Sequence, residues 1–93
     1  MKLSDVSDFY CTECGHKGIP VIRKVGREKE PGHLKKLFCL YCNKETNHVE
    51  IRPNGKYNIN DFFIEYSNGN FIEGKRQLPY KQFEAKMRER EEV

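Results

Sequence analysis

The sequence lacks the apolar runs that would place the chain in a membrane or send it out of the cell. No stretch approaches the roughly 18 consecutive apolar residues that a transmembrane helix requires. The opening MKLSDVSDFY carries one lysine and two aspartates where a signal peptide would have its apolar segment. We therefore expect a soluble, cytoplasmic protein that has no membrane partner.

The sequence also lacks the short motifs of common enzyme chemistry. It contains no glycine-rich phosphate loop, no H-E-x-x-H and no nucleophile elbow. Carboxylate pairs such as Asp61 and Glu65 exist, but 33% of the residues are charged, so pairs of this kind arise by chance. We expect no enzymatic activity and no small-molecule substrate.

The small size of the chain limits how much core it can bury. With 93 residues, 37% hydrophobic content and no tryptophan, it forms one small domain that is marginally stable on its own. Domains of this size usually carry disulfides or a structural metal ion. The expected cytoplasmic location favours the metal, because reducing compartments keep thiols free.

All four cysteines fall in two Cys-x2-Cys pairs, separated by 24 residues: Cys11 and Cys14, then Cys39 and Cys42. This spacing is typical of a four-thiolate zinc site, in which each pair supplies two ligands from one tight turn. Two disulfides, a redox-active pair or an iron site remain alternatives, and we favour a single Zn²⁺ ion. Four cysteines fill a tetrahedral shell, so we expect the ion to be structural.

The residues after each pair suit a metal-binding turn, or knuckle. The position following the second cysteine often requires positive φ, which Gly15 adopts freely and Asn43 tolerates. The paired knuckles CTECG and CLYCN resemble the zinc-ribbon class, over about residues 9–52. The class occurs in transcription factors, RNA-polymerase subunits and ribosomal proteins. This chain departs from its commonest form, because no proline follows the first cysteine of either pair.

The resemblance and the strand patterns predict a small zinc-stabilised, mainly β fold, with an added β-hairpin and a C-terminal α-helix. Residues 1–52 would form the zinc ribbon, and residues 53–93 would pack on it as part of one compact unit. Within the ribbon, IPVIRKV and HLKKLFC are predicted strands joined by GREKEPG into a hairpin-like excursion. TNHVEIR is predicted as a half-buried strand.

The second half supplies the remaining elements. NDFFIEYSNGNFIEG is predicted as two short strands around Asn68-Gly69, a strong hairpin signal. PYKQFEAKMREREEV is predicted as a helix, with Tyr80, Phe83 and Met87 on one face. That stripe either docks on the core or binds a partner. The ribbon histidines are expected to be exposed, and Phe38 is interpreted as a core residue.

Charge distribution points to two functional hypotheses. Residues 15–44 carry a net charge of +6, whereas the whole chain carries +3. The first hypothesis is DNA or RNA binding through this basic hairpin and an exposed aromatic, using Arg23, Lys24, Arg27, Lys29, Lys35, Lys36 and Tyr41. The second is an accessory or inhibitory factor that docks, through its C-terminal half, on a larger machine such as RNA polymerase or another nucleic-acid enzyme.

Overall fold

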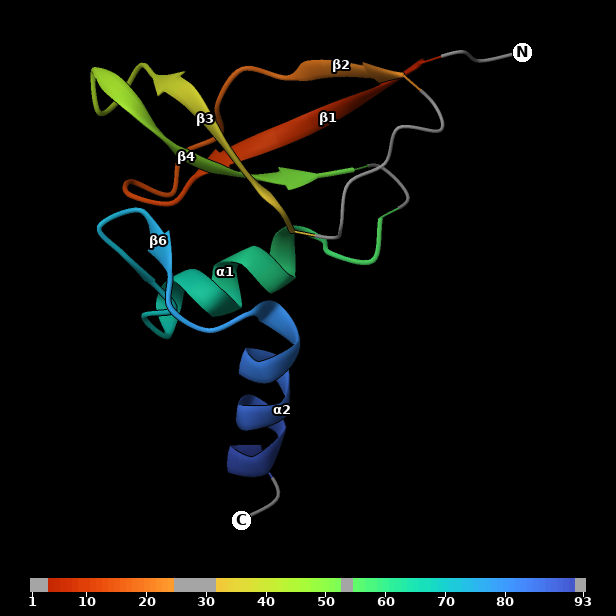
Figure 1. Ribbon diagram of the computed structural model, residues 1–93, viewed down its shortest axis with the longest axis vertical. Helices are drawn as coiled ribbons and strands as arrows, with labels where there is room; N and C mark the ends of the chain where they lie inside the picture. The colour runs from red at the N-terminus through yellow and green to blue at the C-terminus, as the bar shows by residue number, and fades with distance from the viewer. Residues whose placement is uncertain (1–3, 25–31, 53–54, 92–93) are drawn as a thin grey trace.

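The computed structural model describes residues 4–24, 32–52 and 55–91. The protein is small and mainly β, as predicted. A four-stranded antiparallel sheet is followed by a helix, a short hairpin and a C-terminal helix (Figure 1). The elements are β1 (Ser4–Cys11), β2 (Val21–Lys24), β3 (Leu34–Cys39), β4 (Lys44–Ile51), α1 (Ile59–Ser67), β5 (Phe71–Ile72), β6 (Lys75–Arg76) and α2 (Tyr80–Glu91). Within these ranges, neither helix has the length and apolar character needed to cross a bilayer.

The sheet has the strand order β2-β1-β4-β3, so the long strands β1 and β4 lie at its centre. The first half of β1 pairs with β2, with Val6 opposite Ile22, and the second half pairs with β4, with Tyr10 opposite Val49. Strands β2 and β3 therefore form opposite edges. The predicted hairpin between β2 and β3 is wrong. The turn after Cys11 leads β1 back to pair with β2, and the turn after Cys39 leads β3 back to pair with β4.

Residues 59–67 form a helix, which corrects the prediction of a strand before Asn68-Gly69. The side chain of Asn58 accepts hydrogen bonds from the backbone N–H groups of Asn60 and Asp61, at 2.9 and 3.1 Å. The Asp61 carboxylate in turn accepts the N–H of Asn58 at 2.9 Å. This reciprocal capping box fixes the start of α1.

The Asn-Gly pair ends the helix instead of turning a hairpin. Asn68 is the C-cap, and Gly69 takes the left-handed conformation, with φ +77°. The next N–H, that of Asn70, closes the end by donating to the carbonyl of Glu65 at 2.9 Å. The same dipeptide suits both a tight hairpin and a helix C-terminus. The hairpin itself follows one turn later, where Glu73 and Gly74 (φ +52° and +76°) connect β5 to β6.

The core joins the sheet to the C-terminal half. Its buried members are Val49 of β4, Tyr57, Phe62 of α1 and Phe71 of β5. The Phe62 ring lies 5.5 Å from the ring of Tyr10 and 5.9 Å from that of Phe71, measured between centroids. Side chains from Tyr10, Leu34, Ile51, Ile59 and Tyr80 pack around this cluster. One apolar core therefore spans the boundary between residues 1–52 and 53–93.

Replacing Gly69 with alanine tests the helix end. A Cβ at Gly69 would meet nothing within 4 Å, so any cost comes from the backbone conformation at φ +77° alone. We expect Gly69→Ala to lower the free energy of unfolding by about 1–2 kcal/mol, measured by urea denaturation. Ser67→Ala, at the last residue of α1, is the control and should change the free energy of unfolding only slightly. Equal stability of Gly69→Ala and the parent protein would contradict the role of Gly69 as the helix C-terminus.

Candidate metal centre

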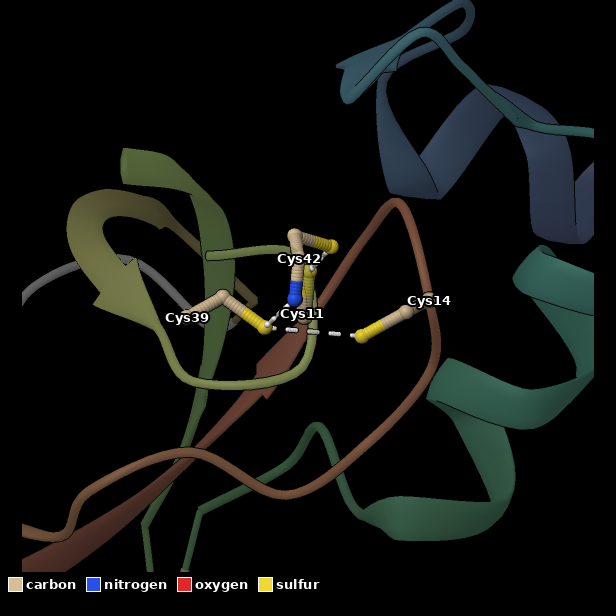
Figure 2. Close-up of side chains that lie close together, drawn as sticks. All are labelled: Cys11, Cys14, Cys39 and Cys42. Atoms are coloured by element: carbon tan, nitrogen blue, oxygen red, sulfur yellow. Dashed lines mark hydrogen bonds between the residues drawn. The ribbon is translucent and has the colours of Figure 1, made fainter. Parts of the chain in front are cut away.

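The two knuckles bring all four cysteines together at one end of the sheet. Cys11 is the last residue of β1 and Cys39 the last of β3, while Cys14 and Cys42 lie in the turns that follow. All four Sγ atoms lie within 4.8 Å of one another (Figure 2). The Cys14–Cys39 sulfurs are 3.5 Å apart, and the Cys11–Cys42 sulfurs are 3.9 Å apart.

These separations suit a single tetrahedral ion. Four sulfurs bound to zinc at about 2.3 Å lie about 3.8 Å from one another. The four side chains are free cysteines, and their sulfurs are arranged as one group. The predicted clustering of the four cysteines is therefore confirmed, and the donor set fits one thiophilic metal ion.

The two knuckles have the same backbone design. The N–H of Gly15 donates to the carbonyl of Cys11 at 2.9 Å, and the N–H of Asn43 donates to that of Cys39 at 2.8 Å. Both residues have positive φ, +77° for Gly15 and +57° for Asn43, as predicted. In each knuckle an N–H also points at the first sulfur: Glu13 to Cys11 and Cys42 to Cys39, both at 3.4 Å.

The ligand atoms differ in their surroundings. In each knuckle the first cysteine is buried and the second is half-buried. Burial raises the pKa of Cys14 and raises that of Cys42 to about 12. Burial also acts on Cys39, but hydrogen bonds from the Cys42 N–H, the Cys14 thiol and the Tyr41 N–H outweigh it and lower the Cys39 pKa to about 7. An incoming cation must therefore displace protons from thiols.

Thr46 is a further member of the centre that the sequence did not reveal. Its buried Oγ1 lies 3.0 Å from Cys11 Sγ, within hydrogen-bonding distance. Hydroxyl donors of this kind orient a thiolate and stabilise its charge. The β4 register alone brings Thr46 to the sulfur, and a threonine on a predicted strand gives no signal of that role.

The first knuckle is in contact with the C-terminal half of the chain. The hydroxyl of Tyr66, on α1, donates to the carbonyl of Glu13 at 3.3 Å. The Tyr66 ring lies so close to Gly15 that a Cβ there would be 3.3 Å from it. On the other side, Lys44 forms an ion pair with the Glu13 carboxylate at 3.3 Å. The metal centre is thus in contact with α1 as well as with the sheet.

The three ribbon histidines have different environments. His16 is exposed, as predicted, and its ring stacks on Tyr41. His33 is partly buried, with its Nδ1 3.0 Å from Glu50. His48 is fully buried, with its Nδ1 2.9 Å from the Thr46 carbonyl. The prediction of exposure is wrong for His33 and His48. His33 lies just before β3 and packs against the buried carboxylate of Glu50. His48 lies on the central strand β4, where consecutive side chains on both faces are buried.

The predicted basic residues that the structure describes come from two different strands. Arg23 and Lys24 lie on β2, at the opposite edge of the sheet from Lys35 and Lys36 on β3. The predicted sites Arg27 and Lys29 lie outside the described residues.

Lys35 and Lys36 lie on β3, an edge strand of the sheet. Lys36 is exposed and Lys35 half-buried, and in the described ranges no ion pair reaches either. Tyr41 is 65% exposed, and Phe38 is 46% exposed, so the interpretation of Phe38 as a core residue is wrong. Phe38 lies on the edge strand, and its ring is not covered by a neighbouring strand.

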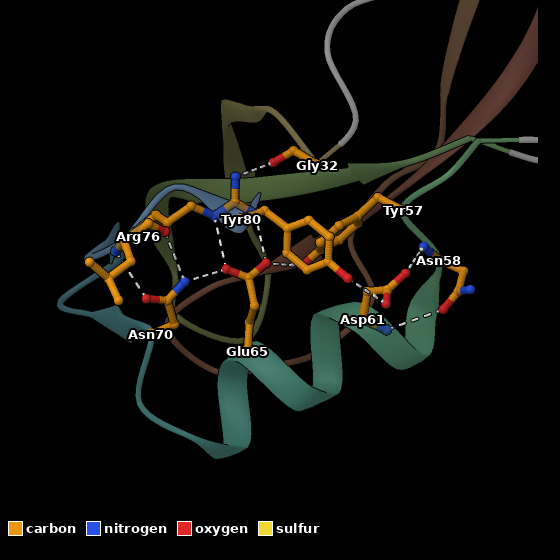
Figure 3. A network of polar contacts seen from close by, with 9 residues as sticks. Gly32, Tyr57, Asn58, Asp61, Glu65, Asn70, Arg76 and Tyr80 are labelled. Atoms are coloured by element: carbon orange, nitrogen blue, oxygen red, sulfur yellow. Dashed lines mark hydrogen bonds and ion pairs between the residues drawn. The ribbon is translucent and has the colours of Figure 1, made fainter. Parts of the chain in front are cut away.

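Glu65 is the centre of a buried polar network that sequence reasoning missed (Figure 3). Its carboxylate accepts two hydrogen bonds from Arg76, at 2.9 and 3.0 Å, and one from the Tyr57 hydroxyl at 2.6 Å. The Asn70 amide donates to the same carboxylate. Arg76 also donates to the carbonyl of Gly32 at 2.6 Å. Both carboxylate oxygens are thus satisfied, so the role of Glu65 is structural.

The predicted stripe on α2 faces the body of the protein. Phe83 is buried, while Tyr80 and Met87 are half-buried. The Tyr80 hydroxyl donates to Asp61 at 2.7 Å, and burial together with this carboxylate raises the Tyr80 pKa. The C-terminal half of α2 extends away from the rest of the molecule (Figure 1).

Comparisons with protein-family models, curated proteins and solved structures found no match to this chain.

Proposed function

We propose that this protein is a non-enzymatic nucleic-acid-binding module held together by one structural Zn²⁺ ion. Cys11, Cys14, Cys39 and Cys42 would hold the ion, which supplies a rigid crosslink between the knuckles. Four thiolates favour zinc and leave no open position for a substrate. The resemblance of the knuckles to the zinc-ribbon class supports the same choice. Iron is the alternative that elemental analysis of the isolated protein distinguishes.

The observation that carries the proposal is the exposed edge formed by β3 and the second knuckle. Lys35 and Lys36 have no ion-pair partner in the described part of the chain, and the exposed rings of Phe38 and Tyr41 follow within a few positions. Lysines of this kind neutralise phosphates, and exposed aromatic rings stack on bases. The surface therefore combines the two contacts that nucleic-acid binding uses.

The carboxylates considered as chance pairs support a non-enzymatic role. Asp61 is engaged by the N-terminus of α1 and by Tyr80, and Glu65 is engaged by Arg76, Tyr57 and Asn70. Each of these contacts holds the fold together. Neither carboxylate is left poised for proton transfer to a substrate.

Charge reversal on β3 tests the proposal. The double variant Lys35→Glu, Lys36→Glu is expected to lose at least about tenfold in affinity for nucleic acid, with a salt slope reduced by about two. Fluorescence anisotropy with labelled oligonucleotides at two salt concentrations gives both quantities. The control, Lys81→Glu with Lys86→Glu, makes the same charge change on α2. Unchanged affinity in the folded β3 variant contradicts the proposal.

A second candidate function is docking on a larger protein machine, such as RNA polymerase or another nucleic-acid enzyme. Two hollows of about 390 Å³ each flank Phe83 and Met87, one between α1 and α2 and the other between α2 and the segment around Asn70. Ile64 and Ile72, which are 46% and 55% exposed, line them. A protein complex formed here would survive high salt, whereas phosphate-driven binding weakens steeply. Dissociation of every captured partner at high salt argues against this candidate.

A further inference from the structure

An exposed pair of stacked rings joins the tips of the two knuckles. His16 comes from the first knuckle and Tyr41 from the second. Their ring centroids are 3.9 Å apart and their planes differ by 10°. Both residues are exposed, and Tyr41 is among the most exposed large side chains of the described chain, at 65%. The two rings are thus stacked face to face, which is the arrangement that a nucleobase adopts on an aromatic side chain.

The knuckles hold this pair on a rigid support. His16 follows Gly15, whose N–H is bonded to Cys11, and the His16 carbonyl accepts the N–H of Cys11 at 3.0 Å. Tyr41 lies between two of the cysteines, in a turn closed by the bond from Asn43 to Cys39. Rings fixed in this way lose little conformational entropy when a third ring stacks on them.

From this pair we infer that the ligand is single-stranded nucleic acid, with one base stacking on the His16–Tyr41 pair. In a duplex, both faces of each base are already stacked, so an exposed ring has nothing to bind without unstacking the duplex. A single strand presents free base faces. Stacking also tolerates any base, so weak sequence preference follows. The inference rests on the proposed nucleic-acid function and specifies its ligand class.

The charges beside the pair suit a strand that continues along β3. Lys36 and Phe38 are two residues apart on β3, so they lie on the same face of the strand, and both are exposed. Lysines at this edge can reach phosphates of a strand whose base lies on Tyr41. Lys44, at the start of β4, is paired with Glu13, so its charge is partly neutralised. On the face of β3 that carries Phe38, Lys36 is the lysine without an ion-pair partner among the described residues, and Lys35 points to the opposite face.

The experiment measures binding of metal-loaded protein to labelled oligonucleotides of about 12 residues, by fluorescence anisotropy. The probes are single-stranded DNA, single-stranded RNA and a DNA duplex of equal length. We expect single strands of at least one sugar type to bind more tightly than the duplex. Tyr41→Leu keeps the apolar bulk but removes the aromatic face, and should weaken single-strand binding by about 5- to 150-fold. Tyr41→Phe should bind like the parent protein.

Controls separate stacking from loss of structure. Leu40→Ala, at a neighbouring side chain that is 73% exposed, should leave binding unchanged. His16→Ala, which removes the other ring, provides a second test that does not alter Tyr41. Each variant is accepted only when it retains the metal content and circular dichroism of the parent.

The outcomes distinguish this inference from the proposed function. Equal binding of duplex and single strand, with no effect of Tyr41→Leu or His16→Ala but loss in the β3 lysine variant, overturns the stacking inference alone. Binding of no probe at low salt overturns both. Preference for single strands that is lost in Tyr41→Leu and retained in Tyr41→Phe supports the inference.

Discussion

Removing the metal ion is expected to unfold the protein. The apparent free energy with which four cysteines bind structural zinc is about 10–16 kcal/mol, as large as the whole stability of a typical domain. The expected result of chelation is loss of the sheet signal in circular dichroism and of a cooperative thermal transition. Adding Zn²⁺ back should restore both.

The loss of structure on metal removal should extend beyond residues 1–52 to the helix α1. Tyr66 of α1 contacts the first knuckle through Glu13 and Gly15, so that knuckle and the helix support each other. Cys39→Ser should therefore reproduce chelation, including loss of helix signal. Glu13→Gln changes a residue of the first knuckle without removing a ligand, and should retain one ion per chain. A cooperative transition at the same temperature with and without metal would show that the ion is not structural.

The second large effect is expected at the buried Glu65–Arg76 pair. Glu65→Gln removes the negative charge from a carboxylate that is fully buried and leaves the Arg76 guanidinium without a counter-charge. Loss of one partner of a buried pair costs about 3–5 kcal/mol. Urea denaturation of the metal-loaded protein should show a loss of this size. Glu84→Gln breaks the exposed pair with Arg88 and should cost under about 1 kcal/mol.

A double variant separates the pair from its surroundings. Adding Arg76→Met to Glu65→Gln removes the stranded charge, so the two changes together should cost less than the sum of the single changes. Additive costs would show that the two side chains act independently. In that case the network in Figure 3 would not be the unit that ties α1 to the β5–β6 hairpin.

The sequence predicted the parts of the fold that local chemistry determines. Cysteine spacing indicated the four-cysteine cluster, and Gly15 and Asn43 indicated the turns, because each signal lies within a few residues. The α2 helix was predicted for the same reason. The helix α1 was missed because Asn-Gly ends a helix as well as it turns a hairpin. The capping box of Asn58 and Asp61 was the available signal that distinguishes the two.

Long-range pairing was beyond a single sequence. Strands β2 and β3 were predicted to pair with each other, but each is held by a different central strand. The burial of His48 and the exposure of Phe38 also depend on contacts between distant segments. Consecutive side chains around His48 on the central strand β4 are buried, whereas Phe38 lies on the exposed face of the edge strand β3. Glu65 was missed because its partners, Arg76 and Tyr57, come from separate segments.

The strand order has a consequence for how the chain folds. Strands β1 and β4, which form the centre of the sheet, are separated in sequence by the whole inter-knuckle segment, so their pairing closes a long loop at an entropic cost. The knuckles stand at the end of β1 and at the β3–β4 turn. An ion bound by Cys11 and Cys42 would hold these two ends together. We therefore expect metal binding to raise the rate of folding as well as the stability, because it would shorten the loop that β1–β4 pairing has to close.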